Sequence, residues 1–170
     1  MQLIQSTQGN VLWECMSLIN DEAVAKVKSL GQVSAMSMSH PHFFSSIIEW
    51  SDALGGVPIY VHAADERWLG RRSKNIVLWQ GDTLQLSPDV TLINCGGHFD
   101  GSSVLHWRGG ANGKGVLLCG DTIYVVADRR YVSFMRSYPN LIPLAAPAVR
   151  QIVERVRPFQ FDRIYSAWFG

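Results

Sequence analysis

The stretch VSAMSMSHPH, from Val33 to His42, decides how the chain is organised. Small and apolar residues from Val33 to Ser39 predict a buried strand, and two histidines follow it immediately. Side chains two residues apart in extended backbone point the same way, so His40 and His42 offer two imidazoles to one ion. Pro41 stiffens the loop between them. We expect a functional site here, because sheets present functional groups at the ends of their strands.

Two further candidate ligands also follow predicted strands. His98 comes after Gly96 and Gly97, and Asp121 follows the run 117–120. An HxH pair by itself fits ordinary surface or core histidines equally well, so the metal hypothesis depends on the whole set. A position at the start of a helix favours the neutral imidazole that a metal requires. The candidate metal ligands are therefore His40, His42, His98 and Asp121.

The residues around the first histidines predict alternating helices and strands. An antiparallel hairpin is expected from Leu3 to Glu14, because Gly9 and Asn10 supply the backbone freedom of a turn. The elements expected next are a helix capped by Asn20 or Asp21 and ended at Gly31, the strand 33–39, a helix with Ile47, Trp50 and Leu54 on one face, and a strand over 58–62. This alternation predicts a buried, parallel sheet between residues 20 and 62.

The rest of the chain predicts antiparallel pairs followed by a helix. A turn at 87–89 joins strands over 83–86 and 90–94, which makes a hairpin. Strands over 104–108 and 116–119 form a second pair, and the glycine-rich run 109–115 between them is expected to be a loose, solvent-facing connection. Pro147 opens a helix that Pro158 stops, and residues 161–167 close the chain as a strand. Residues 129–146 carry no recognisable pattern.

Composition limits the classes of protein to which this chain can belong. It has 170 residues, of which 47% are hydrophobic and 17% charged, and a formal net charge of +1. This composition excludes disorder, collagen and coiled coil, and predicts a single domain over residues 1–170. A charge so near zero supplies no field that would attract phosphate backbones or anionic lipid, so no nucleic-acid partner is expected.

Cysteine content and hydropathy suggest a cellular compartment. Cys15, Cys95 and Cys119 are too few and too widely spaced for a disulfide framework, which fits a reducing environment. The opening residues have no secretory pattern, and no window reaches the roughly 20 apolar residues that span a bilayer. We therefore expect a cytoplasmic protein that does not associate with membranes.

The histidine and aspartate motifs, in their order and spacing, resemble those of the metallo-β-lactamase fold hydrolases. That superfamily has an HxHxDH motif after a strand, a third histidine in a Gly-His segment, and an aspartate at a Gly-Asp strand end. The corresponding segments here are Ser39-His40-Pro41-His42, Asn94 to Ser102 around Gly97-His98, and Cys119-Gly120-Asp121-Thr122. The stretch from Gly9 to Glu14 also resembles the strand before the first helix. The resemblance implies an α/β fold, a metallo-β-lactamase-like αββα sandwich trimmed at both ends.

The chain departs from the superfamily pattern at three ligand positions. Phe44 and Ser45 stand where the motif has Asp and the second His, and residues 166–170 lack the final histidine. The resemblance therefore implies a mononuclear site at most, with His40, His42 and His98 as ligands. Asp121 is either a fourth ligand or a hydrogen-bond anchor for one imidazole.

Two functional hypotheses follow from the resemblance. In the first, the protein is a hydrolase in which one Zn²⁺ ion, or alternatively Fe or Mn, activates water, while Asp121 orients that water or completes the coordination shell. The resemblance implies a small-molecule ester, thioester, lactone or phosphoester as substrate. In the second, the chain is a non-catalytic binding or interaction module of this fold that has lost the second metal site, and its low charge predicts a homodimer or another complex.

Several other residues have a chemical and a structural interpretation. His62, Asp65 and Glu66 fit the start of a short helix over 63–69 better than the site. Glu49 is expected in solvent, His106 as a structural histidine and Cys95 as a small buried hydrophobe rather than a nucleophile. Arg129 and Arg130 are either an anion clamp or solvated surface residues. Most of the six tryptophans are expected in the core.

Overall fold

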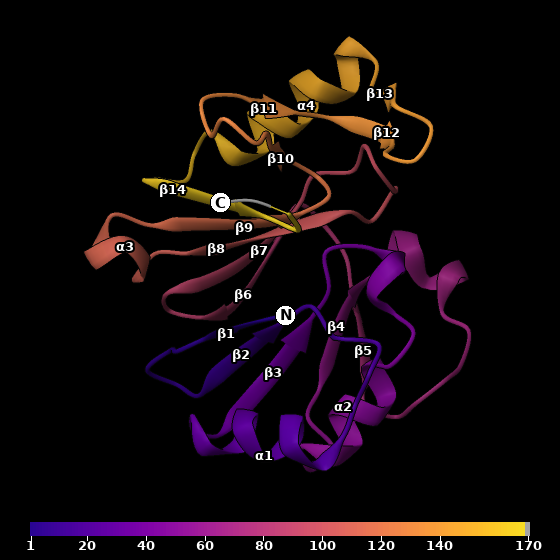
Figure 1. The fold of residues 1–170 in the computed structure, drawn as a ribbon, viewed down its shortest axis with the longest axis vertical. Helices are drawn as coiled ribbons and strands as arrows, with labels where there is room; N and C mark the ends of the chain where they lie inside the picture. The colour runs from indigo at the N-terminus through magenta and orange to yellow at the C-terminus, as the bar shows by residue number, and fades with distance from the viewer. Residues whose placement is uncertain (169–170) are drawn as a thin grey trace.

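The computed structural model describes residues 1–168 and shows two stacked sheets with helices on their outer faces (Figure 1). One five-stranded sheet has the order β1-β2-β3-β4-β5, and the other has the order β14-β9-β8-β7-β6. Helices α1 and α2 lie below the first sheet in Figure 1, and α4 lies above the second. The four layers form the expected αββα sandwich.

The first sheet consists of one hairpin followed by parallel crossovers. Its strands are β1 (Gln2–Ile4), β2 (Asn10–Trp13), β3 (Val33–Ser37), β4 (Ile59–His62) and β5 (Ile76–Trp79). β1 and β2 are antiparallel, whereas the pairs from β2 to β5 are parallel, as the sequence predicted for residues 20–62. Helices α1 (Asp21–Ser29) and α2 (Ile47–Ala53) make the first two crossovers, and the short 3₁₀ helices η1 (Pro41–Phe43) and η2 (Ala63–Trp68) follow β3 and β4.

The second sheet is antiparallel except for its last strand. It contains β6 (Thr83–Ser87), β7 (Val90–Asn94), β8 (Ser103–Trp107) and β9 (Val116–Gly120), each paired with the next, and β14 (Arg163–Ser166), which runs parallel to β9. Helix α4 (Ala146–Val156) begins with Pro147 in its first turn, as predicted. Asn20 caps α1 by accepting a hydrogen bond from the Ala23 N–H, which also confirms the prediction for that helix.

Alternation along the strands divides the core into three layers. In β2, Val11 and Trp13 face the opposite sheet, and Leu12 faces the helices. In β7, Leu92 joins the layer between the sheets, and Ile93 packs with Ile152 of α4. Both sheets are thus apolar on both faces, because each is covered by the other sheet and by helices.

Two segments differ from the sequence prediction. The glycine-rich run 109–115 is not a loose connection: it contains α3 (Gly110–Gly113), and Gly115 is buried against the backbone of Gln160 so closely that a Cβ atom there would overlap it. Residues 129–146, which carried no pattern, contribute to two small hairpins. These pair β10 (Tyr124–Val125) with β11 (Val132–Ser133), and β12 (Met135–Ser137) with β13 (Ile142–Pro143). No helix within residues 1–168 is long and apolar enough to cross a membrane.

Candidate metal centre

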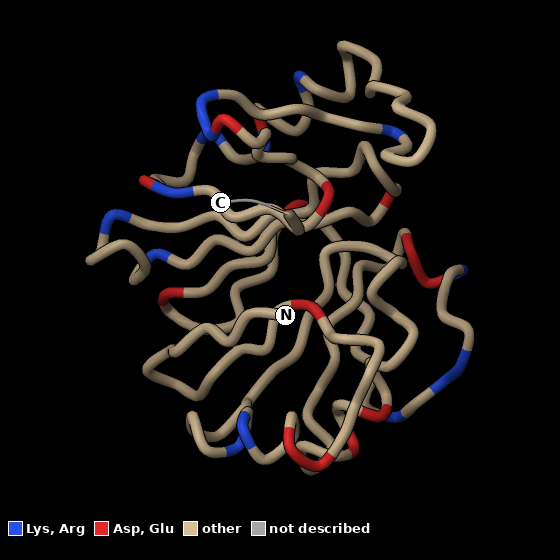
Figure 2. The backbone as a smooth tube through the Cα atoms, viewed as in Figure 1, with Lys and Arg blue, Asp and Glu red and all other residues tan. Residues whose placement is uncertain are grey.

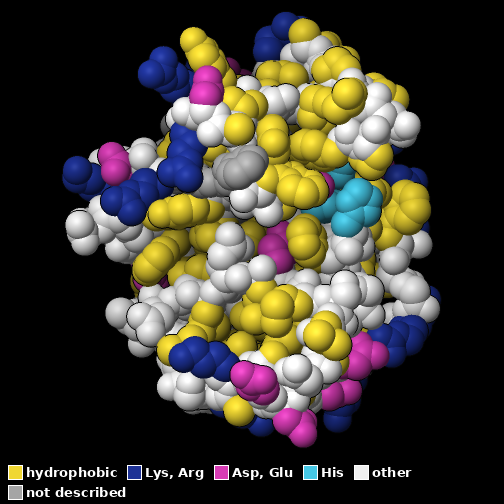
Figure 3. All heavy atoms as spheres, in the orientation of Figure 1, with side chains coloured by type: hydrophobic (Ala, Val, Ile, Leu, Met, Phe, Trp, Pro, Cys, Tyr) yellow, Lys and Arg dark blue, Asp and Glu magenta, His cyan; other side chains and the backbone are white. Residues whose placement is uncertain are grey.

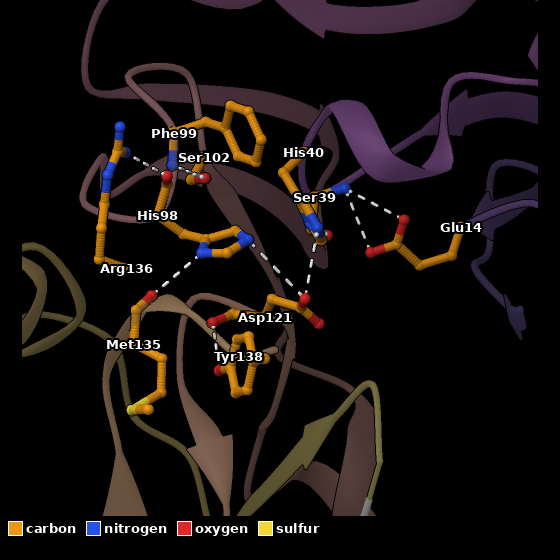
Figure 4. Close-up of polar contacts among 10 residues, drawn as sticks. All are labelled: Glu14, Ser39, His40, His98, Phe99, Ser102, Asp121, Met135, Arg136 and Tyr138. Carbon is orange, nitrogen blue, oxygen red and sulfur yellow. Dashed lines mark hydrogen bonds and ion pairs between the residues drawn. The ribbon is translucent and has the colours of Figure 1, made fainter. Parts of the chain in front are cut away.

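The four predicted ligands come together at one edge of the sandwich, where strands of both sheets end. His40 and His42 follow β3, His98 follows β7, and Asp121 follows β9. One candidate ligand atom from each residue can be chosen so that all four lie within 4.8 Å of one another. Within residues 1–168 they form the one group of three or more potential ligands with such convergence. Figure 4 shows His40, His98 and Asp121 pointing toward a shared centre.

The polar atoms at this centre are arranged so that a cation fits between them. Asp121 Oδ2 lies 3.5 Å from His40 Nε2 and 3.8 Å from His98 Nε2, and neither of these buried nitrogens has a hydrogen-bond partner within the described residues. His98 Nδ1 lies 3.0 Å from the Met135 carbonyl oxygen, which can only accept, so Nδ1 carries the proton. In neutral His98, Nε2 is then a bare lone pair facing a carboxylate oxygen. The donor set fits a divalent metal ion bound by imidazoles and one carboxylate.

His40 is oriented from behind by a serine and a buried glutamate. Ser39 Oγ lies 2.7 Å from His40 Nδ1, and the Ser39 N–H donates to both carboxylate oxygens of Glu14 at 3.2 Å (Figure 4). Burial raises the pKa of Glu14 to about 8, although the hydrogen bonds from Ser39 act in the opposite direction. Gly120, with φ +52°, passes so close to Ser39 that a Cβ atom would overlap its hydroxyl. A carbonyl- or hydroxyl-bound Nδ1 is the usual means by which proteins fix the tautomer of a ligating histidine.

His98 and Asp121 are held by β12 and the residue after it, a segment without a recognisable sequence pattern. Arg136 donates from Nη1 to the His98 carbonyl oxygen at 2.7 Å, next to the bond between Met135 and the His98 ring. The Tyr138 hydroxyl donates to the Asp121 carbonyl oxygen at 2.7 Å. Sequence reasoning missed these residues, and no motif could have identified them, since they act through neighbouring backbone atoms and lie in an irregular segment.

The protonation states at the centre suit a metal site. Burial lowers the pKa of both His40 and His98 from the ordinary histidine value. For Asp121, burial acts to raise the pKa, but the close approach of His40 and of the other nearby imidazoles holds it below the ordinary aspartate value. Near neutral pH the imidazoles are therefore uncharged and the carboxylate is ionised, the states in which these groups bind metal. The lowered histidine pKa comes from burial, since η1 is too short to contribute an appreciable dipole.

The centre lies at the floor of an open cavity of about 850 Å³. Its walls include Trp68, Phe99, Tyr138 and Trp168, and Figure 3 shows histidine surface flanked by hydrophobic side chains. Phe99 contacts the rings of all three histidines, with centroids 5.0 to 5.7 Å apart. The cavity can accommodate an apolar molecule whose reactive group reaches the centre.

Most of the six tryptophans lie in or against the core as expected, including Trp107, which packs against the layer between the sheets, and two do not. Trp68 and Trp168 are 49% and 60% exposed, and both line the cavity. Trp13, Trp50 and Trp79 are buried as expected. The exposed pair are apolar side chains that folding leaves in contact with solvent around the candidate site.

The remaining candidates lie outside the cluster. His62 caps η2 by accepting from the Ala64 N–H, as its position predicted. Asp65 is not a cap: it is buried and accepts a hydrogen bond from the Gly101 N–H at 2.9 Å, which helps hold the loop that carries His98. His106 is a structural histidine bonded to the Gln160 carbonyl oxygen.

The other predicted residues have structural environments as well. Glu49 forms a surface ion pair with Arg71 at 2.7 Å, and Glu66 is exposed in η2. Burial raises the pKa of the Cys95 thiol to about 12, which makes it a poor nucleophile. The three cysteines are free and buried. Arg129 and Arg130 are exposed, and they line a different cavity from that of the metal centre.

The departures from the superfamily motif are visible in three dimensions. Phe44 is partly buried and packs against the core beneath the first sheet, and Ser45 is exposed with its hydroxyl 3.4 Å from Ser17 Oγ. Neither contributes to the ligand cluster. Of the segment 166–170 in which the final histidine was sought, residues 169 and 170 lie outside the described residues.

No protein-family model matches the chain. The uncharacterized protein YmaE of Bacillus subtilis (strain 168) is 48% identical over 166 residues, which make up 98% of this chain. The chain spans 60% of the length of that curated relative.

Solved structures with the same arrangement are metal-dependent enzymes. An N-acyl homoserine lactone hydrolase, solved with the product N-hexanoyl-L-homoserine at its catalytic metal centre, has a TM-score of 0.67 at 19% identity, covering 96% of this chain and 78% of that one. The metallo-β-lactamase SMB-1, in complex with mercaptoacetic acid, has a TM-score of 0.66 at 20% identity, covering 97% and 71%. At these identities the likeness concerns the fold.

Proposed function

Because the chain has the metallo-β-lactamase fold, we propose that it is a mononuclear metal-dependent hydrolase of small, uncharged acyl substrates, either esters or lactones. One observation supports this proposal most directly. The bare Nε2 lone pair of His98 and the unpartnered Nε2 of His40 face the carboxylate of Asp121 at the floor of an open cavity. A cation between these atoms would satisfy buried polar groups that otherwise have no hydrogen-bond partner within the described residues.

The ligands in this proposal are His40, His42 and His98, with Asp121 as the fourth ligand or as the group that orients water. Zinc is the metal that this donor set favours, with iron or manganese as alternatives. A bound metal ion would polarise a substrate carbonyl and lower the pKa of bound water from 15.7 toward about 7. The ionised Asp121 carboxylate accepts a hydrogen bond from the attacking water and holds it toward the floor of the cavity. Hydrolysis then adds one water across the acyl bond and yields a carboxylic acid and an alcohol.

The walls of the cavity favour an apolar acyl group over a phosphate. Trp68, Phe99 and Trp168 present aromatic surface. Of the two arginines in the lining, Arg67 is paired with Asp100 at 2.8 Å and Arg136 already donates to the His98 carbonyl oxygen. Burial of apolar surface is therefore the main source of binding energy that the walls offer.

The proposal can be tested by metal analysis together with hydrolysis assays. Protein expressed without chelators is expected to contain close to one equivalent of metal, or to bind one equivalent of Zn²⁺ on titration. The loaded protein should hydrolyse p-nitrophenyl butyrate much faster than p-nitrophenyl phosphate. The variant H98A should lose both metal and activity, and the matched control H62A, which removes a histidine outside the cluster, should keep both. Less than about 0.1 equivalent of metal with no uptake of Zn²⁺ would overturn the proposal.

A second candidate function is a non-catalytic binding module. It is favoured by one observation, the exposed apolar side chains of Leu141 and Ile142 beside the cavity, 78% and 48% exposed. A homodimer that covers this surface would be seen by size-exclusion chromatography with light scattering. The two candidates are separated by activity, because only the hydrolase requires turnover of an ester. A cytoplasmic location is also proposed, on the basis of the three free, buried cysteines.

A further inference from the structure

A second cavity, distinct from that of the metal centre, lies beside the free edge of the second sheet. It measures about 680 Å³ and is lined by residues from two places, the hairpin of β10 and β11 and the edge strand β14. Figure 2 shows basic residues both on the turn between β10 and β11 and at the start of β14. The two cavities share no lining residue.

Three arginines line this second cavity, namely Arg129, Arg130 and Arg163. All three are exposed, and within residues 1–168 none of them forms an ion pair, whereas Arg67, Arg71, Arg155 and Arg157 each have a carboxylate partner. The nearest acids in sequence are Asp128, which accepts a hydrogen bond from the Arg130 N–H, and Asp162. Three guanidinium groups without an ion pair in the described part of the chain thus line one cavity, with Asp128 and Asp162 as the neighbouring acids in sequence.

The elements that carry these arginines are well defined. Arg129 has φ +59° and its N–H donates to the Val126 carbonyl oxygen at 2.8 Å, which closes the turn between β10 and β11. On β14, Arg163 and Tyr165 lie two residues apart and so share a face of the strand. The cavity is thus formed by a tight turn and a strand rather than by a long loop.

The remaining lining is apolar and aromatic. Val125, Val132 and Ile164 supply aliphatic surface, and Tyr131 and Tyr165 supply two rings, of which Tyr131 is 71% exposed. Figure 3 shows hydrophobic side chains between the basic groups at this edge of the molecule. Exposed tyrosine rings and guanidinium planes both stack on flat aromatic molecules.

We propose that this cavity binds a phosphomonoester carried on a planar aromatic group. A phosphomonoester has a charge of about −1.5 to −2 and three acceptor oxygens, which can satisfy more than one guanidinium fork. A carboxylate has a single charge and two oxygens, which one arginine already saturates. The aromatic part of the ligand stacks on Tyr131 or Tyr165. This site is independent of the hydrolase proposal, because it uses none of the residues of the metal centre.

The test measures the binding of three probes to the full-length chain by isothermal titration calorimetry. Phenyl phosphate combines both parts of the expected ligand, inorganic phosphate lacks the ring, and benzoate keeps the ring but replaces the phosphate with a carboxylate. Phenyl phosphate is expected to bind most tightly, by about tenfold or more over each of the other two. The affinity should fall steeply as the salt concentration rises, since the arginines are exposed.

Variants locate the binding site. R130Q and R163Q should each weaken phenyl phosphate binding about tenfold or more, because each removes a charge-assisted hydrogen-bond donor. The control R150Q removes an exposed arginine of α4 outside the cavity and should leave the affinity unchanged. H98A should also leave it unchanged, which excludes binding at the metal centre.

Three outcomes would overturn the proposal. In the first, benzoate binds as tightly as phenyl phosphate. In the second, R130Q and R150Q lose equal amounts of affinity for phenyl phosphate. In the third, H98A no longer binds phenyl phosphate. Thermal unfolding of each variant provides the check on folding, since substitutions of exposed residues of this kind normally change stability little.

Discussion

Ser39 Oγ lies 2.7 Å from His40 Nδ1, on the side of the ring opposite to the atom that faces Asp121. In the tautomer with a proton on Nδ1, the His40 N–H donates to the serine oxygen and Nε2 is left as a lone pair. The same arrangement exists at His98, where the Met135 carbonyl oxygen takes the place of the hydroxyl. Two imidazoles from different sheets therefore present the same nitrogen to one point.

Substitution of Ser39 by alanine tests this orientation. S39A is expected to weaken Zn²⁺ binding by about 10 to 100-fold, because the ring loses the group that fixes its tautomer. The matched control is S34A in β3, the strand that precedes Ser39, because the Ser34 hydroxyl donates to the Asn10 carbonyl oxygen away from the centre. Competition with a chelator of known affinity measures both variants. Equal zinc affinities in S39A and S34A would show that the serine has no role in orienting His40.

The buried Glu14 predicts a dependence of stability on pH. Its pKa of about 8 in the folded protein exceeds the ordinary value of 4.5, because burial disfavours the carboxylate. The folded state therefore holds a proton that the unfolded state releases above about pH 4.5. The contribution of Glu14 to the free energy of unfolding is fully present below pH 4.5 and declines as the pH rises toward 8. Two neighbouring charges modify the shift, the N-terminal amine lowering the pKa and Asp121 raising it.

The variant E14Q separates this effect from the titration of other groups. A glutamine accepts the Ser39 N–H as glutamate does but cannot ionise, so the variant should show a weaker decline in the free energy of unfolding between pH 5 and pH 8. Urea unfolding at several pH values measures the difference. A decline of the same slope in E14Q and in the natural sequence would contradict the prediction.

Alanine substitutions at Gly120 and Gly113 distinguish the stability cost of backbone strain from that of steric overlap. Both have positive φ, +52° and +82°, but a Cβ atom at Gly120 would overlap Ser39 whereas at Gly113 it would meet nothing. G113A should lower the free energy of unfolding by about 1 to 2 kcal/mol, because alanine is strained in the left-handed backbone conformation. G120A should cost roughly 1 to 3 kcal/mol more, because it also overpacks a buried contact. Chemical denaturation gives both values, and equal losses would mean that the contact between Gly120 and Ser39 is not tight.

The aromatic wall of the cavity predicts a preference for long acyl groups. Trp68, whose ring lies 5.5 Å from that of Phe99, borders the open side of the cavity. W68A should raise KM for p-nitrophenyl octanoate several-fold and leave p-nitrophenyl acetate nearly unaffected, since only the longer chain reaches the missing ring. The control L18A removes an exposed apolar side chain that does not line the cavity. A rise in KM of the same size for both esters would show that Trp68 does not bind the acyl chain.

Comparison of H98A with D121N distinguishes the two roles considered for Asp121. H98A should abolish zinc binding, whereas D121N should weaken it by about 10 to 100-fold if the carboxylate anchors an imidazole or water. Saturation is expected near one equivalent in the natural sequence, since Phe44 and Ser45 cannot bind a second ion. Atomic absorption after dialysis against Zn²⁺ measures the stoichiometry. A zinc site in which Asp121 is indispensable and His98 dispensable would show that the ligand set is misassigned.

Residues close together in sequence determined much of the fold. The hairpin turn that ends at Gly9, the cap at Asn20 and the proline at the start of α4 were all predictable, because turns and helix ends depend on the few residues that form them. The positions of His40, His42, His98 and Asp121 after strands were likewise visible in the sequence.

The tertiary structure alone decided how those side chains are oriented and what surrounds them. Met135, Arg136 and Tyr138 act on the centre through backbone carbonyl oxygens or a hydroxyl, and they belong to a segment without periodicity. The packing of Gly115 and Gly120 against distant backbone and side chains was also invisible, because a glycine in sequence does not indicate what approaches it. Local sequence specifies which groups stand at the ends of strands. Which of them meet depends on contacts between residues far apart in the chain, and the stacking of the two sheets creates those contacts.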